Sequence, residues 1–273
     1  MSFEVKIIEH SKNPYNGIEL ITYHLIYPRL IHSEILTHRV FSRNAMSSRA
    51  IPVAKMIEQV RKHPAMPVFW GKNQPGMQAS EEFKGKELSR ARKLWLDAAK
   101  AAANYAEKMT ELGMHKQLAN RVLEPWQNMQ TIVTATDWSN FYALRKHPDA
   151  QPEFRYLAEM MWETYCESTP TNRYYHLPYV TQHERETITV QKCMMFSTAR
   201  CARVSYLTNE GKEPDHDKDI ELYKRLVGSI PIHASPTEHA AIASQSDKYI
   251  KNFRGWRQHR VTVEDNLLTM EKR

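Results

Sequence analysis

Alternating apolar and polar side chains predict two strands near the start of the chain. Residues 3–9 alternate in this way, and the same period of two returns over residues 18–26. The run Asn-Pro-Tyr-Asn-Gly at 13–17 separates them and is a strong turn signal. After Pro28 the apolar side chains follow a helical spacing as far as Val40. We therefore expect a hairpin that leads into a helix.

Helical spacing of apolar residues returns in three later stretches, 52–63, 81–112 and 217–227. Residues 64–80 are rich in Pro, Gly, Asn and Gln and predict a surface loop, and residues 167–190 predict a polar connection. The longest helix carries an apolar stripe that we expect to pack in the core, formed by Leu88, Ala91, Trp95, Ala98, Ala102, Tyr105, Met109 and Leu112.

These elements predict an α+β fold. With 273 residues, 41% of them hydrophobic, the chain can bury a real core as one large domain or two small ones. We interpret residues 1–273 as a single domain. Its strands, at 3–26 and near 230–245, are expected to form one mixed or antiparallel sheet with the helices packed on one side.

The positive net charge of the chain favours certain kinds of binding partner. The formal net charge is +7 and the pI is about 9.2, which favours an anionic partner such as a nucleic acid, a nucleotide or a phosphate cofactor. The arginines cluster in short motifs without a long basic stripe. This clustering favours small phosphorylated ligands.

Other features bear on the cellular compartment. No run of about 18 apolar residues occurs, so we expect no membrane span. The N-terminus lacks the basic and apolar blocks of a secretory signal. The three cysteines are scattered and give neither a disulfide framework nor a CxxC zinc spacing. We therefore expect a cytoplasmic protein in a reducing setting.

Residues 37–49 are the stretch with the clearest candidate chemistry. They hold three arginines, a histidine, three serines and an asparagine, with no acid. Guanidinium groups, hydroxyls and backbone N–H groups are donors that bind phosphate or carboxylate. An anion-binding loop at the junction of two elements fits this composition. A solvated basic turn is the alternative.

The order of these residues resembles the signature of the flavin-dependent thymidylate synthases, the ThyX family. The pattern His38-Arg39-x-x-Ser-x-Asn44-x-x-Ser47-x-Arg49 is in place. Thr37 and Ala45 stand where the family has Arg and Glu.

Two further blocks carry the same resemblance. The first block covers residues 117–161. In the family this region has an Arg-x-Val-Leu-Pro, an Asn-Phe-x-x-Leu-Arg and an Ala-Gln-x-Glu element. The matching positions here are Arg121, Asn140, Arg145, Gln151 and Glu153. Over residues 198–239 an Ala-Arg-Val-Ser-Tyr run ending at Tyr206 is followed by a His-x-Ser-Pro-x-Glu-His block. In the family that last block precedes the others, so the order here is that of a circular permutation. The tail at 252–260 has no clear family counterpart.

The resemblance implies conversion of dUMP to dTMP with FAD, methylenetetrahydrofolate and NADPH, with no cysteine attacking the pyrimidine. Arg145 would be catalytic, lying against the uracil edge, and the protein would be a homotetramer with sites at subunit junctions. The nucleotide would be bound by Glu34, Ser47, Ser48, Arg49, Arg121 and Arg145. The cofactors would be bound by His38, Arg39, Asn44, Asn140, His233, Ser235 and Glu238.

Departures from the family pattern leave alternatives open. Glu34 stands where the family has a glutamine that contacts the nucleotide, and Thr134-Ala-Thr136 stands where it commonly has Asn-x-Arg. Modification of another pyrimidine nucleotide such as dCMP, by methylation or hydroxymethylation, is therefore a second interpretation. A non-catalytic, basic nucleic-acid-binding protein is a third, although no known recognition module is present. The spacing of the His-x-Ser-Pro-x-Glu-His block fits no common zinc pattern, so we expect no metal.

Overall fold

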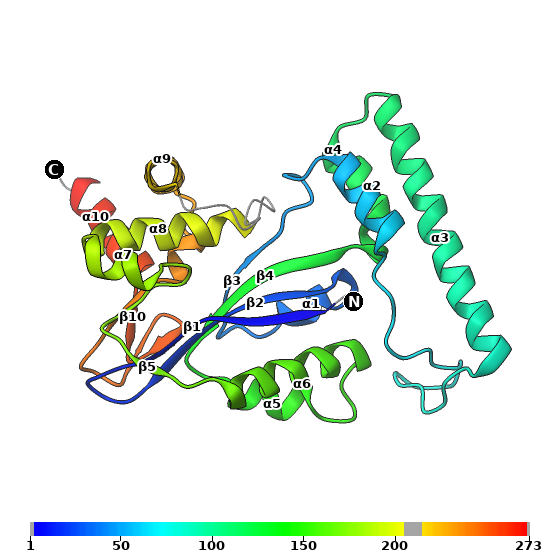
Figure 1. Ribbon diagram of the computed structural model, residues 1–273, viewed down its shortest axis with the longest axis horizontal. Coiled ribbons are helices and arrows are strands. Elements are labelled where there is room, and N and C mark those ends of the chain that lie inside the picture. Colours follow the sequence, from blue (N-terminus) through cyan, green and yellow to red (C-terminus); the bar gives the residue numbers. More distant parts are fainter. Residues whose placement is uncertain (1–2, 205–214, 272–273) are drawn as a thin grey trace.

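The computed structural model describes residues 3–204 and 215–271 (Figure 1). Its centre is a five-stranded sheet with strand order β3-β4-β2-β1-β5. The neighbours β1–β2, β2–β4 and β3–β4 are antiparallel, whereas β1–β5 is parallel. The α+β class and the mixed sheet are thus confirmed. The strands are β1 Glu4–Lys12, β2 Glu19–Pro28, β3 Ser42–Ala45, β4 Asn128–Ala135 and β5 Thr171–Asn172.

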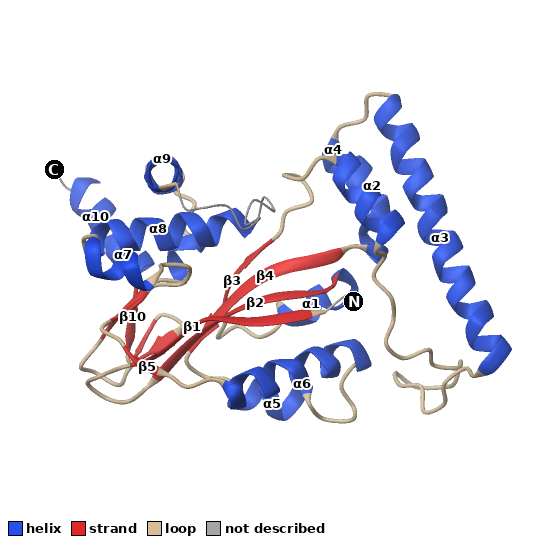
Figure 2. Cartoon of the chain, in the orientation of Figure 1, coloured by secondary structure: helices blue, strands red, loops and turns tan. Residues whose placement is uncertain are grey.

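The short strands β6 to β10 form two sheets separate from the main one; Figure 2 draws all strands in red. One has the order β10-β7-β6 and the other pairs β8 with β9. The prediction that strands near 230–245 join the N-terminal strands in one sheet is therefore wrong. Ala241 of β7 instead packs with Leu20 and Trp256 in a cluster of its own. These strands are β6 Tyr175–His176, β7 Ala241–Ala243, β8 Tyr249–Ile250, β9 Phe253–Arg254 and β10 Trp256–Gln258.

The helices include the two shorter ones predicted at 52–63 and 217–227, which are confirmed as α2 and α9. The α-helices are α1 His32–Ile35, α2 Val53–Lys62, α3 Gly85–Glu111, α4 Lys116–Ala119, α5 Ser139–Arg145, α6 Pro152–Glu167, α7 Gln182–Thr187, α8 Val190–Arg203, α9 His216–Val227 and α10 His259–Glu271. The 3-10 helices include η1 Arg29–Ile31, η2 Asn120–Trp126 and η4 Ser235–Glu238. Among the described helices, none combines the length and the apolar composition that a membrane crossing requires.

The period of two along β2 gives the main sheet two different faces. Tyr23 points to the side covered by α5 and α6, where its ring lies 5.0 Å from Trp138 and its hydroxyl 2.9 Å from that of Tyr142. On the other face, Ile132 packs against Cys201 of α8. Helices therefore cover the expected face and, in addition, part of the opposite one (Figure 1). The C-terminal region is held against this second face.

The arginine-rich stretch at 37–49 was predicted to be a loop, but part of it is a strand. Its middle is β3, which pairs antiparallel with β4; the polar side chains of Ser42 and Asn44 are buried, and they alternate with the half-buried Arg43 and Ala45. The helix predicted from Pro28 to Val40 is also shorter than expected, since α1 ends at Ile35. The remaining residues form turns that return the chain to the sheet edge.

The apolar stripe predicted for α3 is only partly a packing face. Leu112 and Tyr105 are exposed, whereas the buried residues are the alanines Ala99, Ala103 and Ala106. The helix packs closely on α2 and η2 through these small side chains. Of the larger residues in the predicted stripe, Met109 packs against the core and the half-buried Trp95 donates to the Ala65 carbonyl at 2.9 Å, whereas Tyr105 and Leu112 face outward.

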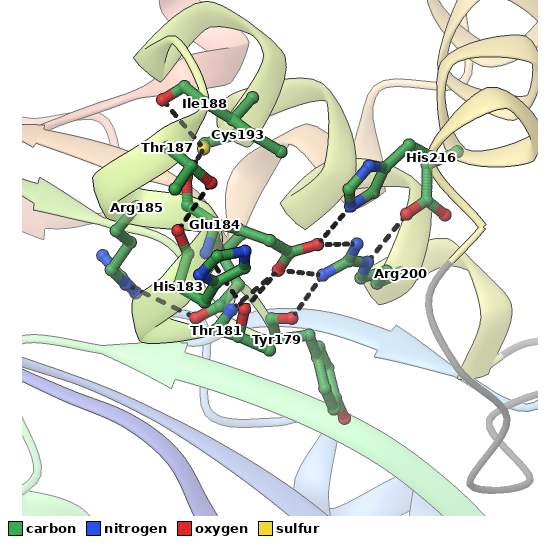
Figure 3. A network of polar contacts seen from close by, with 12 residues as sticks. Tyr179, Thr181, His183, Glu184, Arg185, Thr187, Ile188, Cys193, Arg200 and His216 are labelled. Atoms are coloured by element: carbon green, nitrogen blue, oxygen red, sulfur yellow. Dashed lines mark hydrogen bonds and ion pairs between the residues drawn. The ribbon is translucent and has the colours of Figure 1, made fainter.

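Residues 167–190, predicted as a polar connection, contain β5, β6 and α7. A Thr-x-x-Glu capping box starts α7: Thr181 accepts from the Glu184 N–H, and Glu184 accepts from the Thr181 N–H at 2.8 Å. The same Glu184 joins α7 to α8 and α9 through Arg200, which also pairs with Asp219 (Figure 3). Ser205 and Tyr206, predicted as part of the next block, lie outside the described residues.

Candidate active site

Arg145, at the C-terminal end of α5, lies against the turn that follows α1. Its Nε donates to His38 Nε2 at 2.9 Å, one terminal nitrogen donates to Glu34 at 2.9 Å, and the other to Thr37 Oγ1 at 3.3 Å. The guanidinium carbon stacks 4.4 Å from the ring centre of Phe154. Its side chain retains 19% exposure and that of Glu34 retains 29%. The structure thus brings together three of the predicted site residues in a partly open position.

His38 is held as a neutral acceptor for Arg145. Its ring stacks on Phe41 at 5.4 Å and meets the edge of Phe141 at 5.1 Å. Burial, together with the charges of Arg145 and Arg43, lowers the pKa of His38 to about 4. At neutral pH the ring is therefore neutral, and because a guanidinium can only donate, the lone pair that faces Arg145 is on Nε2 and fixes the orientation of the guanidinium.

Arg43, which sequence reasoning did not single out, builds this turn. It donates to the carbonyl of Leu36 at 2.6 Å and to that of His38 at 3.2 Å. Asn44 points to the opposite face of the sheet and donates to the carbonyl of Cys201 at 2.8 Å. Arg39, between these groups in sequence, is exposed.

A second group of predicted residues follows β3. The buried amide of Asn120 donates to the carbonyls of Ser48 at 2.6 Å and Ile51 at 3.0 Å, which brings η2 to this turn. Arg49 and Arg121 are both exposed there. Arg121 pairs with Glu124 at 2.5 Å. Ser47 is half-buried, and its carbonyl closes the turn by accepting from the Ala50 N–H at 2.9 Å.

The C-terminal block packs beside the arginine-rich stretch in space. The 3-10 helix η4 contacts β3, and Glu238 within it pairs with Arg260. Gln258 is buried and donates to Ser42 of β3 at 2.8 Å. The tail at 252–260 thus has a structural role, joining η4 to β3. The only sequence feature that pointed to this tail is Gln258-His259-Arg260, which loosely resembles the Gln and His-Arg residues that lead into the arginine motif.

The other predicted cofactor residues lie at the surface. His233 and Ser235 are exposed around η4, and Asn140 is exposed at the start of α5. A cavity of about 880 Å³ opens between α9, the 228–232 turn that precedes His233, and α10. Most of its lining is apolar, with Val227, Ile232 and Val263 contributing. A lining of this kind and size fits a flat aromatic ring system such as that of a flavin or a folate.

The family model described as thymidylate synthase complementing protein matches residues 16–171, more than half of the chain. This chain belongs to the ThyX family. The matched range contains the arginine-rich stretch and Arg145. Membership supports a thymidylate synthase-like methyltransferase as the class of enzyme.

Two solved structures are similar to this ThyX-family chain. One is a UMP/dUMP methylase PolB from Streptomyces cacaoi bound with 5-Br UMP, with 14% identity, a TM-score of 0.49, and coverage of 60% of this chain and 89% of that one. The other is the same methylase bound with 5-Br dUMP, with 14% identity, a TM-score of 0.48, and coverage of 60% and 90%. No curated protein matches the chain.

Proposed function

We propose that the protein methylates dUMP to dTMP, using FAD, methylenetetrahydrofolate and NADPH. The observation that carries this proposal is the convergence of Arg145, His38 and Glu34, from two separate motifs of the family, in one partly exposed cluster. A guanidinium stays protonated at any working pH and can stabilise the anion that forms when a uracil loses its N3 proton. The stack on Phe154 and the bond to His38 position the guanidinium without neutralising it, whereas Glu34 is the one member of the cluster that carries the opposite charge.

The nucleotide phosphate is assigned to the second group, Ser47, Ser48, Arg49 and Arg121. Two exposed guanidinium groups beside a turn that carries the half-buried Ser47 suit a phosphate dianion. This group is separated from the Arg145 cluster by β3, whose four residues span about 13 Å.

The cofactors are assigned to His38, Arg39, Asn44, Asn140, His233, Ser235 and Glu238. The contact of η4 with β3, which brings the C-terminal block beside the arginine-rich stretch, supports this assignment. A bound flavin would supply the hydride chemistry, and the protein would supply orientation and electrostatics. The proximity of η4 to β3 also supports a single domain over residues 1–273 with permuted blocks.

We further propose a homotetramer with sites at subunit junctions. The outward-facing apolar residues of α3 support self-association: Leu94 is 63% exposed and Leu112 is 83% exposed. Analytical ultracentrifugation tests this point, and a monomer at micromolar concentration would contradict it.

The proposed activity is tested by release of deuterium from C5 of labelled dUMP in the presence of all three cofactors. Arg145→Ala should lower turnover about 10²–10³-fold, the usual loss of a preorganised charge. Arg145→Lys should fail almost as badly, because an ammonium lacks the planar fork. The half-buried Arg155 of α6, which pairs with Glu159 at the surface, is the matched control when replaced by Ala. Full turnover of Arg145→Ala would overturn the assignment.

Purified protein should also bind a flavin, visible by absorbance at about 450 nm. A colourless protein that takes up no flavin and binds DNA would favour the non-catalytic alternative.

A second candidate is modification of dCMP, and the Arg145–Glu34 pair favours it. The carboxylate at 2.9 Å cancels much of the positive field that would stabilise a uracil anion. A carboxylate can also accept from the 4-amino group of cytosine, which uracil lacks. Glu34→Gln should then shift the ratio of dCMP to dUMP turnover about tenfold or more towards dUMP, since such a base contact contributes about 1–3 kcal/mol. An unchanged ratio would remove this candidate.

A further inference from the structure

A chain of buried polar side chains crosses the space between the five-stranded sheet and the β10-β7-β6 sheet. Each member is fully buried, with 0% exposure. The members come from four strands and the residue after η4: Ser11 of β1, His176 of β6, Thr22 of β2, Thr134 of β4 and His239. Polar groups buried to this degree require hydrogen-bond partners, and neighbours in this chain supply them.

The hydrogen bonds are short and continuous. Ser11 Oγ lies 2.8 Å from His176 Nδ1, and His176 Nε2 lies 2.8 Å from Thr22 Oγ1. Thr22 Oγ1 lies 2.7 Å from Thr134 Oγ1, which lies 2.8 Å from His239 Nδ1. Distances alone leave the direction of each bond open, because hydroxyls and neutral imidazoles can both donate and accept.

Glu9 removes that ambiguity at one end. Its carboxylate pairs with Arg185 at 2.7 Å and also accepts from Ser11 at 3.1 Å. A carboxylate beside a guanidinium can only accept, so the single proton of Ser11 is directed to Glu9. Ser11 can then only accept from His176, which must carry its proton on Nδ1.

The proton position fixed at Ser11 also fixes the direction of every later hydrogen bond in this series. Burial lowers the pKa of both His176 and His239, the latter to about 3, so each imidazole is neutral and has one N–H. His176 Nε2 therefore accepts from Thr22, and Thr22 accepts from Thr134. Thr134 has no further proton, so it accepts from Nδ1–H of His239. His239 Nε2 ends the chain as a bare acceptor, buried and with no partner among the described residues.

We propose that Glu9 sets the tautomer of His239 through this chain, and that Ser11, His176, Thr22 and Thr134 are positioning residues for the 233–238 segment. The role in positioning rests on the proposed function, which assigns that segment to cofactor binding. His239 follows η4 directly, so the bond to Thr134 ties the end of the segment to β4. A fixed tautomer gives His239 one orientation of donor and acceptor and thereby one anchored position for η4.

The test is ¹⁵N NMR of the histidine side chains in the cofactor-free full chain at pH 7, which needs no enzymatic activity. Nitrogens with and without a proton resonate far apart, so the tautomer is read directly. The expected result is Nδ1–H for both His176 and His239. An Nε2–H tautomer of His239 in the wild-type protein would overturn the proposal.

Two variants test the direction of the chain. Thr134→Val, which keeps the shape but removes the hydroxyl, should release His239 into a mixture of tautomers while His176 stays Nδ1–H. Ser11→Ala should release both histidines, because it cuts the link to Glu9. Ser89→Ala, at an exposed serine of α3, is the control and should change neither. A folded Ser11→Ala protein in which His239 remains entirely Nδ1–H would refute the role of Glu9.

If Thr134→Val or Ser11→Ala fails to fold, Thr134→Ser is the variant to measure. It retains the hydroxyl, so both histidines should remain Nδ1–H as in the wild-type protein. Flavin retention is then measured on the folded variants. A loss in Thr134→Val that Thr134→Ser restores supports the positioning role, whereas equal retention in both refutes it. A wild-type protein that binds no flavin would count against the proposed function and leave the tautomer result standing.

Discussion

The ionic cluster that joins α7, α8 and α9 gives a sharp prediction about stability. Glu184 is 5% exposed and Arg200 is 7% exposed, with one of their N···O distances at 2.5 Å (Figure 3). His216 also contacts the Glu184 carboxylate, at 2.8 Å. Burial alone would raise the pKa of Glu184, but hydrogen bonds from Arg200, the Thr181 N–H and His216, with the charge of Arg200, lower it to about 2.

The magnitude follows from that pKa. A fall from 4.5 to about 2 corresponds to about 3 kcal/mol of stability at neutral pH, at roughly 1.36 kcal/mol per pKa unit. Because the folded-state pKa is depressed, this contribution is complete well above pH 4.5 and is lost as the pH falls towards 2. About half of it should remain near pH 3.3. Glu184→Gln should therefore lower the free energy of unfolding by about 3 kcal/mol at pH 7.

Urea unfolding followed by circular dichroism measures this difference at pH 7 and near pH 3.3. Glu186→Gln is the matched control, because Glu186 lies on the same helix but is exposed. The difference between wild type and Glu184→Gln should shrink at the lower pH. Equal stability of the two variants at pH 7, or a difference that does not depend on pH, would refute the reasoning.

Three further predictions concern other parts of the molecule. Arg49→Ala should weaken nucleotide binding by about 1.5–3 kcal/mol, measured by calorimetry, with flavin content unchanged; equal loss of both ligands would make Arg49 structural. Replacement of each cysteine by Ser should leave most of the turnover in folded protein, because burial raises the pKa of Cys193 and Cys201 and keeps them as thiols. Gly255→Ala should lower the melting temperature more than Gly113→Ala: both have positive φ, but only at Gly255 would the new Cβ lie 2.8 Å from Ile18.

Short-range patterns in the sequence determined the local elements and the candidate chemistry. The period of two gave β1 and β2, and the helical spacing gave α2 and α9, because these signals depend only on neighbouring residues. The motifs around His38 and Arg145 indicated the family for the same reason. The family match over residues 16–171 confirmed that interpretation.

Contacts between distant residues were decided by the tertiary structure. Arg145 and Glu34 are 111 positions apart, and no local sequence pattern indicates that the Glu34 carboxylate pairs with the Arg145 guanidinium. The strand β7, which pairs with β6 and β10, packs through Ala241 in a cluster that brings together Leu20 and Trp256 from opposite ends of the sequence. The stripe predicted for α3 is only partly a core face: Met109 packs against the core, but Tyr105 and Leu112 are exposed, because an apolar stripe on one helix does not reveal which neighbour covers it. The buried series of hydrogen bonds from Glu9 to His239 could not be predicted from the sequence. Its Ser, Thr and His residues are isolated in sequence and come into contact only when the strands that carry them pair in the fold.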